Sequence, residues 1–431
     1  MAKLSIRQPV DQAQVQPEQR TVRKAPRLSV SSTFAALRYR NYRLWFSGQM
    51  VSLVGTWMQS TAQGFLVYQL TGSSAYLGYV GFAAGVPSWL FTLYGGLITD
   101  RVPKRTLLVI TQSSMMVLAF ILAGLTFADV VQAWQIVILA FFLGIANAFD
   151  APARQAFVLE LVERQDLTNA IALNSTMFNL GTAVGPAVAG LTYSAFGPAW
   201  CFMINGVSFL AVISALILMK PKAMPLPERR GSAVREIREG ISYVASNRRV
   251  RTLILNLGVT SLFGLGFVTL MPAWAVKVLG GDATTNGLLQ SARGVGALAG
   301  ALMIAAVGGF ISRERLFSLG SLVFPSLLFV YAFLRWLPLS LLCLMGIGWG
   351  FMVMVNSSNA LIQTQVPDQL RGRVMSIFTL SFFGLMPVGS FLSGRLADWI
   401  GEPTTVILGS LVLFATAIWI ALRVPELHRA S

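Results

Sequence analysis

The residues with the clearest potential for chemistry form a short charged turn between two long apolar runs. Asp100, Arg101, Lys104 and Arg105 lie within six positions, and Gly96 comes one helical turn before them. Glycine lets a helix approach its neighbour closely, and Asp100 and Lys104, four residues apart, can form an ion pair. An acid at this depth can also meet the positive N-terminal end of another helix. The turn is therefore either a contact between helix ends or only an anchor where a span stops.

A second pattern combines small residues with proline inside one apolar run. Gly181, Gly185, Pro186 and Gly190 fall within residues 170–194. The glycines allow tight backbone contact, and the proline breaks the hydrogen-bond ladder and bends the helix. A bent, closely packed helix can seal a central cavity against leakage. The pattern is a weak signal by itself, because Gly and Pro are common in membrane helices.

Uncharged and basic side chains inside the apolar runs are candidates for lining a cavity. Arg293 either meets an anionic or strongly polar ligand or extends to the water at the end of its span. Gln59 and Gln63 are four residues apart and share one helix face. They either bind a ligand or bridge two helices. Asn356 is a further candidate.

Acidic residues are absent from the middle of the apolar runs. Proton coupling normally needs a titratable group that burial can perturb. The carriers that the sequence offers are Asp100 and Asp150 at span ends, with Asp398 as a weaker third. We expect Asp150, pressed against Asp100, to titrate during a transport cycle. Facilitated diffusion without a proton is the alternative.

The composition indicates that membrane helices position these residues. The chain has 431 residues, of which 55% are hydrophobic and 12% are charged, and its mean hydropathy is +0.66. A soluble domain carries about 25% charged residues. Twelve windows each hold roughly 18 or more mostly apolar residues, enough to cross a hydrocarbon core of about 30 Å. The windows lie near 44–70, 74–99, 106–127, 133–149, 170–194, 200–219, 252–279, 286–310, 316–334, 336–362, 374–397 and 403–422.

The distribution of basic residues sets the orientation. With the N-terminus inside, all 33 Lys and Arg residues fall on the inner side except Lys277, Arg293, Arg335 and Arg395. This bias predicts that both termini are cytoplasmic. It also accounts for the net charge of +16 through membrane insertion and anionic lipid, without a nucleic-acid partner. No metal or cofactor is expected, because the two cysteines lie within separate spans and the single histidine lies in the tail.

The chain divides into two similar halves around a basic segment. We expect a disordered cytoplasmic arm at 1–33, a six-helix bundle at 34–219, a linker with a short amphipathic helix at 220–251, a second bundle at 252–422 and a tail at 423–431. Gly95–Arg101 is echoed by Gly308–Glu314. The set Leu167, Gly181, Gly185 and Gly197 is echoed by Leu370, Gly384, Gly389 and Gly401. Chance similarity is possible between glycine-rich helices, but the matching order favours duplication, as in transporters that rock two bundles around a central site.

Six plus six spans, a basic central loop and a charged turn after the second span together resemble the major facilitator superfamily, over about residues 34–425. The charged turn resembles its motif A, with Pro103 where glycine is usual. The Gly181–Gly190 pattern resembles motif C of exporting members, with Ala172 and Ala189 at two of the family's glycine positions.

Two further segments, Leu37–Trp45 and Asn147–Gln155, resemble a bacterial group within that superfamily, the transmembrane secretion effector transporters. This group includes enterobactin exporters and macrolide and multidrug efflux proteins. The resemblance implies an all-α integral membrane protein with two pseudo-symmetric six-helix bundles, monomeric in the bacterial inner membrane. It implies export of a drug, siderophore or related amphipathic metabolite by alternating access, as a proton antiporter. Asp150 would join the motif A residues in a latch that closes the inner face in the outward-open state.

Other classes of function fit the sequence less well. An enzyme is disfavoured because the only histidine, in the tail, leaves no nucleophile–base set, and no phosphate-binding loop is present. An importer or symporter on the same fold is disfavoured by the Gly181–Gly190 pattern. A non-transporting membrane receptor would have no use for a latch.

Overall fold

Helices form all regular structure in the part of the chain that the computed structural model describes, residues 34–219, 233–307 and 310–424. A backbone in hydrocarbon must satisfy its own N–H and C=O groups, and an α-helix does so within one segment. The apolar runs of the sequence therefore form the helices, and short turns containing Gly, Pro or polar residues join them.

The first group contains six long helices after the 3-10 turn η1 (Ala35–Arg38). They are α2 (Arg40–Thr71), α3 (Ser74–Arg101), α4 (Lys104–Phe127), α5 (Ala133–Leu161), α6 (Leu167–Phe196) and α7 (Pro198–Leu218), with the short turn η2 (Arg164–Asp166) before α6. Most ends lie within a few residues of the expected windows.

Helix α5 is the main exception, because the expected window stopped at 149 whereas the helix continues to Leu161. Pro152 lies inside it. Proline removes one backbone hydrogen bond, a loss that membrane helices tolerate where neighbouring groups satisfy the freed carbonyl. Because α5 continues past residue 149, Asp150 and Arg154, four residues apart, lie on one face of the helix.

The second group begins after residues 220–232, which lie outside the described part. The expected linker continues as helix α8 (Ala233–Ser246). After Asn247, which caps the next helix by accepting a hydrogen bond from the Val250 amide, the chain runs as α9 (Arg248–Val259), η3 (Thr260–Gly264), α10 (Gly266–Thr269), α11 (Met271–Ala273) and η4 (Trp274–Val278). The π-helical turns η3 and η4 and the ring of Pro272 interrupt regular bonding, so this helical segment is broken. Five long helices follow: α12 (Ala283–Val307), α13 (Arg313–Tyr331), α14 (Leu337–Gln365), α15 (Asp368–Ile400) and α16 (Glu402–Arg423).

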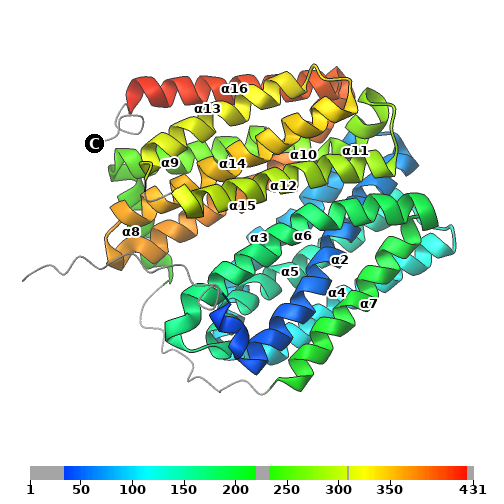
Figure 1. Cartoon of the computed structure of the whole chain (residues 1–431), viewed down its shortest axis with the longest axis horizontal. Coiled ribbons are helices and arrows are strands. Elements are labelled where there is room, and N and C mark those ends of the chain that lie inside the picture. Colours follow the sequence, from blue (N-terminus) through cyan, green and yellow to red (C-terminus); the bar gives the residue numbers. More distant parts are fainter. Residues whose placement is uncertain (1–33, 220–232, 308–309, 425–431) are drawn as a thin grey trace, which may run out of the picture.

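The helices run back and forth between two ends of the molecule (Figure 1). We call the end where α2 begins and α16 finishes the linker end, and the opposite end, where α2 finishes and α16 begins, the far end. Figure 1 shows the two groups side by side toward the far end and diverging toward the linker end.

The two groups repeat each other in their turns and contacts. Gly72 and Gly280 both have φ of 63° at the far end of the first helix of each group, and Gly197 and Gly401 have φ of 89° and 87° after the fifth. Glycine adopts such angles without strain. Between the groups, α3 packs on α15 and α6 packs on α12, so the second helix of each group contacts the fifth of the other.

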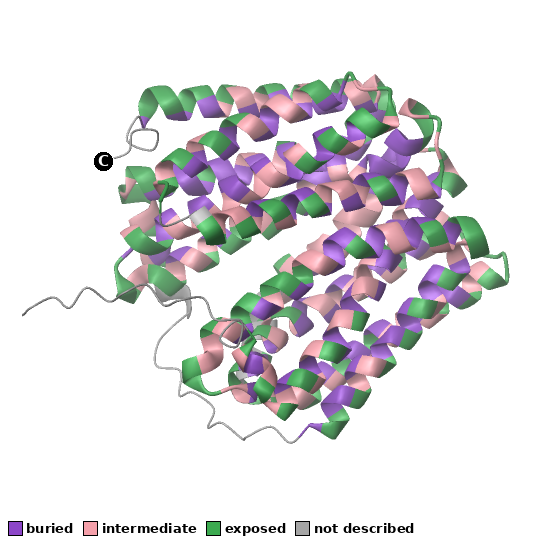
Figure 2. Cartoon of the chain, in the orientation of Figure 1, coloured by how far each residue is buried: buried purple, intermediate pink, exposed green. Residues whose placement is uncertain are grey.

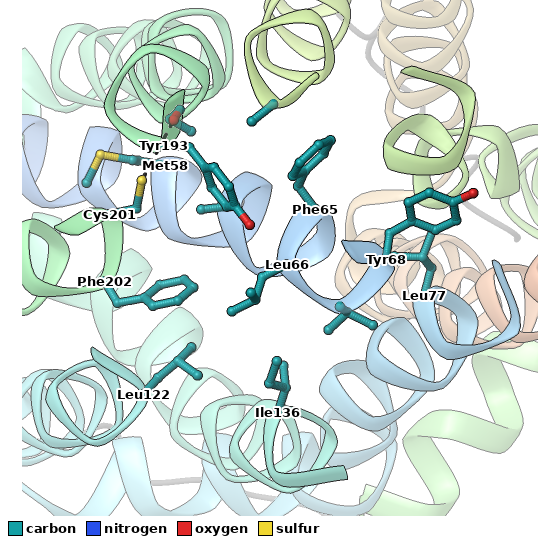
Figure 3. Packing of buried hydrophobic residues seen from close by; sticks show 14 of the residues in the cluster. Met58, Phe65, Leu66, Tyr68, Leu77, Leu122, Ile136, Tyr193, Cys201 and Phe202 are labelled. Carbon is teal, nitrogen blue, oxygen red and sulfur yellow. Dashed lines mark hydrogen bonds between the residues drawn. The ribbon is translucent and has the colours of Figure 1, made fainter. Parts of the chain in front are cut away.

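A buried apolar cluster surrounds α2 and connects it to other helices of the first group (Figure 3). The rings of Phe65 and Tyr193 meet edge to face with centroids 5.2 Å apart. The cluster members labelled in Figure 3 are Met58, Phe65, Leu66, Tyr68, Leu77, Leu122, Ile136, Tyr193, Cys201 and Phe202.

The outside of the bundle is apolar. Leu191, Leu342 and Leu380 are each more than 60% exposed, and exposed residues follow the outer helices in Figure 2. Soluble monomers rarely expose such continuous apolar surface. Within the described ranges, nine helical segments are long and apolar enough to cross a membrane, namely α4, α5, α7, the broken segment Arg248–Val278 and α12 to α16.

The packing of α6 on α2 gives a test. Gly185→Ala places a methyl group 2.5 Å from Trp57 Cβ, whereas Gly124→Ala meets nothing within 4 Å. We expect Gly185→Ala to destabilise the protein by about 1–3 kcal/mol through overpacking, and Gly124→Ala to be neutral or to stabilise by up to about 1 kcal/mol. Thermal unfolding of the detergent-solubilised chain measures both. Equal melting temperatures for the two variants would contradict the close contact.

Candidate functional site

The glycine pattern of α6 brings this helix against α2. A Cβ atom at Gly181 would lie 3.0 Å from Trp57 Cδ1, and one at Gly185 would lie 2.5 Å from Trp57 Cβ. A contact of 2.5 Å is shorter than real Cβ contacts, so a larger residue at Gly185 requires movement of α2, and one at Gly181 requires Trp57 to shift slightly. Pro186, the residue after Gly185 in the sequence, lies inside α6.

The next part of α6 meets α12 of the second group. A Cβ at Gly190 would lie 2.9 Å from the carbonyl oxygen of Ala283, and one at Gly287 would lie 2.4 Å from that of Pro186. Gly294, two turns further along α12, repeats this contact with a Cβ 2.5 Å from an α6 carbonyl oxygen. The α6 pattern therefore lies between two helices of different groups and closes their contact toward the far end.

The symmetric contact of α3 with α15 is equally close. A Cβ at Gly85 would lie 2.0 Å from Pro387 Cγ, and one at Gly394 would lie 2.6 Å from the Ser74 carbonyl oxygen. In lipid, the hydrophobic effect does not draw helices together. Close approach of their backbones is therefore one of the interactions that stabilise their packing.

Five residues that we call the clasp add charge to this second contact at the far end. Asp398 Oδ1 accepts a hydrogen bond of 2.6 Å from the backbone N–H of Ser74, and its Oδ2 accepts one from the Ser73 hydroxyl. Glu402 Oε1 accepts a bond of 2.8 Å from the Ser74 hydroxyl and lies 2.9 Å from Lys277 Nζ. Two carboxylates of the second group thus face the positive N-terminal end of α3 in the first.

The sequence indicated only part of the clasp. The sequence predicts Asp398 as a weak proton carrier and Lys277 only as a base on the outer side. Glu402 and the two serines were missed. An acid on each side of Gly401 is the feature of the sequence that could have indicated the clasp. The α3 terminus that these acids meet is, however, more than 300 residues away along the chain.

The bases of the charged turn bind within the first group. Lys104 Nζ lies 2.8 Å from Glu160 Oε1 of α5, and Arg105 donates to the carbonyl oxygens of Leu216 and Ile217 at the end of α7. Basic groups at a helix C-terminus stabilise its free carbonyls. Arg101 is exposed at the end of α3. The turn therefore ties α4 to α5 and α7, a role that the sequence does not indicate.

The surroundings of Gly96 and of the Asp100 side chain lie outside the described part of the structure, and so do the expected contacts of Asp100 with Lys104, with Asp150 and with another helix terminus. The backbone places Asp100 at the last turn of α3 and Lys104 at the first residue of α4. The two residues thus belong to different helices.

Asp150 is 1% exposed in the interior of the first group. Its Oδ1 accepts hydrogen bonds of 2.9 Å from Thr111 and 2.8 Å from Gln112, both on α4. Arg154 Nη2 lies 3.1 Å from Oδ2, at ion-pair distance but without hydrogen-bond geometry. The ion pair with Arg154 and the two hydrogen bonds offset the cost of burying this acid.

A cavity of about 130 Å³ adjoins Asp150. Three buried polar atoms of its lining residues have no hydrogen-bond partner: Gln49 Nε2, Gln112 Oε1 and Asp150 Oδ2. A polar cavity of this size has room for water. The other polar residues that line it are Ser52, Thr56, Asn147 and Arg154.

The polar candidates on α2 and α14 differ in their surroundings. Gln59 accepts a bond of 2.7 Å from Asn205 of α7 and is buried, so it bridges two helices of the first group. Gln63 is also buried. Asn356 is half-buried on α14, one turn beyond Met352, which packs on Gly300 of α12.

Arg293 lies ten residues after the first residue of α12, about 15 Å along the helix axis. It is half-buried, and its Nε atom is enclosed without a hydrogen-bond partner. This depth favours a side chain that meets an interior partner over one that extends to water at the helix end.

A wider cavity of about 690 Å³ opens at the far end, beyond the contact of α6 with α12. Phe65, Tyr68 and Tyr193 line it together with Asp282. The glycine contacts of α6 with α12 therefore lie between this cavity and the linker end.

Two solved transporter structures resemble the chain in their fold. The chain matches a POT family transporter in complex with 5-aminolevulinic acid with a TM-score of 0.71 and 12% identity, covering 91% of this chain and 97% of that one. It also matches a bacterial homologue of the human lysosomal transporter Spinster in an inward-facing, unoccupied conformation, with a TM-score of 0.65, 11% identity and coverage of 93% and 97%. At these identities the likeness concerns the fold.

Curated relatives share a quarter or more of the sequence over nearly their whole length. The staphyloferrin A transporter of Staphylococcus aureus is 25% identical, covering 88% of this chain and 95% of the relative. The multidrug efflux pump Tap of Mycolicibacterium fortuitum is 28% identical, with coverage of 85% and 92%. Macrolide efflux protein A of Streptococcus pyogenes is 25% identical, with coverage of 88% and 96%.

These relatives are transporters rather than enzymes. The family model described as transmembrane secretion effector matches residues 31–431, almost the whole chain. With two groups of helices joined through α3–α15 and α6–α12, the chain belongs to the transmembrane secretion effector family of the major facilitator superfamily.

Proposed function

We propose that the chain is a secondary active transporter that exports a small molecule from the cytoplasm by alternating access. The observation that carries this proposal is the asymmetry of the contacts between the two groups. The described hydrogen bonds that join them, including those of the clasp, lie toward the far end, whereas the ribbons diverge toward the linker end (Figure 1). A carrier that alternates needs one closing contact at each end, used in turn.

The Lys and Arg bias supports an orientation with the linker end in the cytoplasm. All twelve long helical segments then cross the bacterial inner membrane, both termini are cytoplasmic, and the present structure corresponds to an inward-open state. The protein acts as a monomer, because each closing contact is built within one chain.

The relatives and the packing of α6 support the proposed direction and substrate. The relatives named above include a siderophore transporter and two efflux pumps. The glycine and proline pattern of α6 closes the far end by close packing, as an exporter requires to prevent leakage. We therefore propose a drug, siderophore or related amphipathic metabolite as the substrate.

In the outward-open state, Gly96, Asp100, Arg101, Lys104 and Asp150 would form the latch at the linker end. Lys104 and Asp150 have partners within the first group in the present state. The first group therefore keeps these charges satisfied while the linker end is open.

Asp150 is the residue that we propose to carry the coupled proton. It is buried, its Oδ2 atom is approached only by Arg154 among its described contacts, and a polar cavity adjoins it. A proton taken up from the outer side would neutralise Asp150 and release Arg154, and its loss to the cytoplasm would restore the pair.

This proposal predicts the behaviour of Asp150→Asn. Inverted membrane vesicles with an acidic interior expose the linker end, and we expect the wild-type chain to accumulate ethidium or carboxyfluorescein in exchange for protons. Asp150→Asn should lower gradient-driven accumulation on the order of tenfold or more while leaving downhill exchange of the same probe intact. Fluorescence of the vesicles with and without the imposed gradient measures both.

The matched control is Asp129→Asn, which makes the same change in the turn after α4. Asp129 has φ of 56°, an angle that asparagine tolerates, so transport should be unchanged. Full gradient-driven accumulation by Asp150→Asn would show that Asp150 is not the proton carrier. An absence of transport by the wild type in this orientation, with transport in the reverse one, would favour an importer.

The clasp predicts a shift in the conformational equilibrium. Asp398→Ala removes two hydrogen bonds to the α3 terminus and should weaken closure of the far end by about 1–2 kcal/mol, a roughly 5- to 30-fold change in population. Disulfide formation between Ser194→Cys and Thr284→Cys reports on closure, because the two hydroxyls lie 2.8 Å apart across α6 and α12. The test uses a background in which Cys201 and Cys343 are replaced by Ser.

We expect slower cross-linking in Asp398→Ala. Glu314→Ala, which removes an acid from the first turn of α13 within one group, should leave the rate unchanged. An unchanged rate in Asp398→Ala and in the double variant that also carries Glu402→Ala would show that the clasp does not hold the far end closed.

A further inference from the structure

Helix α12 presents four distinct sides to its surroundings. Gly287 and Gly294 contact α6, and Gly296 and Gly300 contact α14. Between these two contacts lies a polar face of α12, which we define as Asn286, Gln290 and Arg293, spaced four and three residues apart. The opposite side carries the exposed residues Leu288, Val295 and Leu302.

The polar face of α12 points into the protein toward α2. Gln290 Oε1 lies 3.4 Å from the Thr61 hydroxyl of α2, and Gln290 Nε2 donates to Asn286 Oδ1 at 3.2 Å. Asn286 is fully buried. Arg293 follows Gln290 on the side that adjoins α14, where its carbonyl oxygen lies 2.0 Å from the Cβ position of Gly348. Arg293 therefore lies on the inner side of α12, away from the exposed leucine and valine side chains, and the Nε atom of its guanidinium is enclosed.

Donor groups on this face lack acceptors. Among the described residues, Asn286 Nδ2 and Arg293 Nε are enclosed and have no hydrogen-bond partner. Within the described ranges, Arg293 takes part in no ion pair. The carboxylates there that pair with bases do so elsewhere: Asp150 with Arg154, Glu160 with Lys104, Asp166 with Arg38, Glu239 with Arg373, Asp368 with Arg371 and Glu402 with Lys277.

An unpaired cation at this depth is costly and marks a functional site. The cost of burying an ion is offset only by an opposite charge with good hydrogen bonds. Guanidinium binds carboxylates through two parallel N–H bonds, and the amides of Asn286 and Gln290 add neutral donors beside it. The missing partner of this face is therefore an anion with acceptor oxygens.

We propose that Arg293, supported by Asn286 and Gln290, binds a carboxylate group of the transported molecule, so that the substrate is an organic anion. This inference rests on the proposed export function and adds the charge class of the substrate. The contacts of Gly190 and Gly287 close the far-end side of the polar face, so the anion reaches Arg293 from the linker end. Asn356 of α14 lies nearer that end.

The test compares an anionic and a cationic probe in inverted vesicles, carboxyfluorescein and ethidium. For Arg293→Gln we expect carboxyfluorescein uptake to fall on the order of ten- to a hundredfold, because a charge-assisted hydrogen-bond pair is lost. Arg293→Lys should retain intermediate uptake, since lysine keeps the charge but not the bidentate geometry. Ethidium uptake should not fall in either variant. Arg335→Gln, the same substitution in the turn after α13 where Arg335 binds only backbone carbonyls, should behave as wild type.

Thermal unfolding separates a binding role from a structural one. Because Arg293 has no counter-ion in the described structure, Arg293→Gln should leave the melting temperature unchanged or raise it, whereas a structural arginine would lower it. Equal loss of both probes in Arg293→Gln, or a wild-type chain that moves ethidium but not carboxyfluorescein, would overturn the assignment while leaving export intact. A wild-type chain that moves neither probe would contradict the proposed function as well as the anion.

Discussion

The close approach of helices at glycine residues is the constraint on which the rest of this structure depends. In lipid, apolar side chains gain nothing by leaving the solvent, so helices associate through backbone contact and polar bonds. Gly185 lets α6 lie against α2, and Gly287 lets α12 lie against α6. The equivalent contact of α3 with α15 uses Gly85 and Gly394. These two symmetric contacts hold the groups together at the far end and set the geometry of every polar residue between them.

Charges occupy two kinds of position relative to these contacts. Lys104 and Arg105 tie helices within the first group to one another, so that this group can move as one body. Asp398 and Glu402 instead join the two groups by meeting the start of α3. The first kind persists through any rocking motion, whereas the second must break when the far end opens. Moderate strength suits the bonds between the two groups, because the inward-open and outward-open states of a carrier must lie within a few kcal/mol of each other.

Arg293 fits neither kind, whereas the other interior charges of the described residues have partners. Asp150 shows the usual solution, with two hydrogen bonds from α4 and a base four residues away on its own helix. The polar face of α12 has donors without acceptors. A residue that binds a ligand should lack a permanent partner within the protein, because such a partner would compete with the ligand.

The sequence by itself determined the helices, because a run of apolar residues in hydrocarbon has only one way to satisfy its backbone and because glycine marked the turns at Gly197 and Gly401. It also indicated the repeat and the family. It did not determine that α5 runs past Pro152, or that Gln59 bonds to α7. Nor did it place Asp398 against α3. Those features were decided by the tertiary structure, since each depends on which helix lies alongside. In a membrane protein, positions that face lipid and positions that face another helix are equally apolar. The periodicity of apolar residues therefore does not indicate which helix is the neighbour.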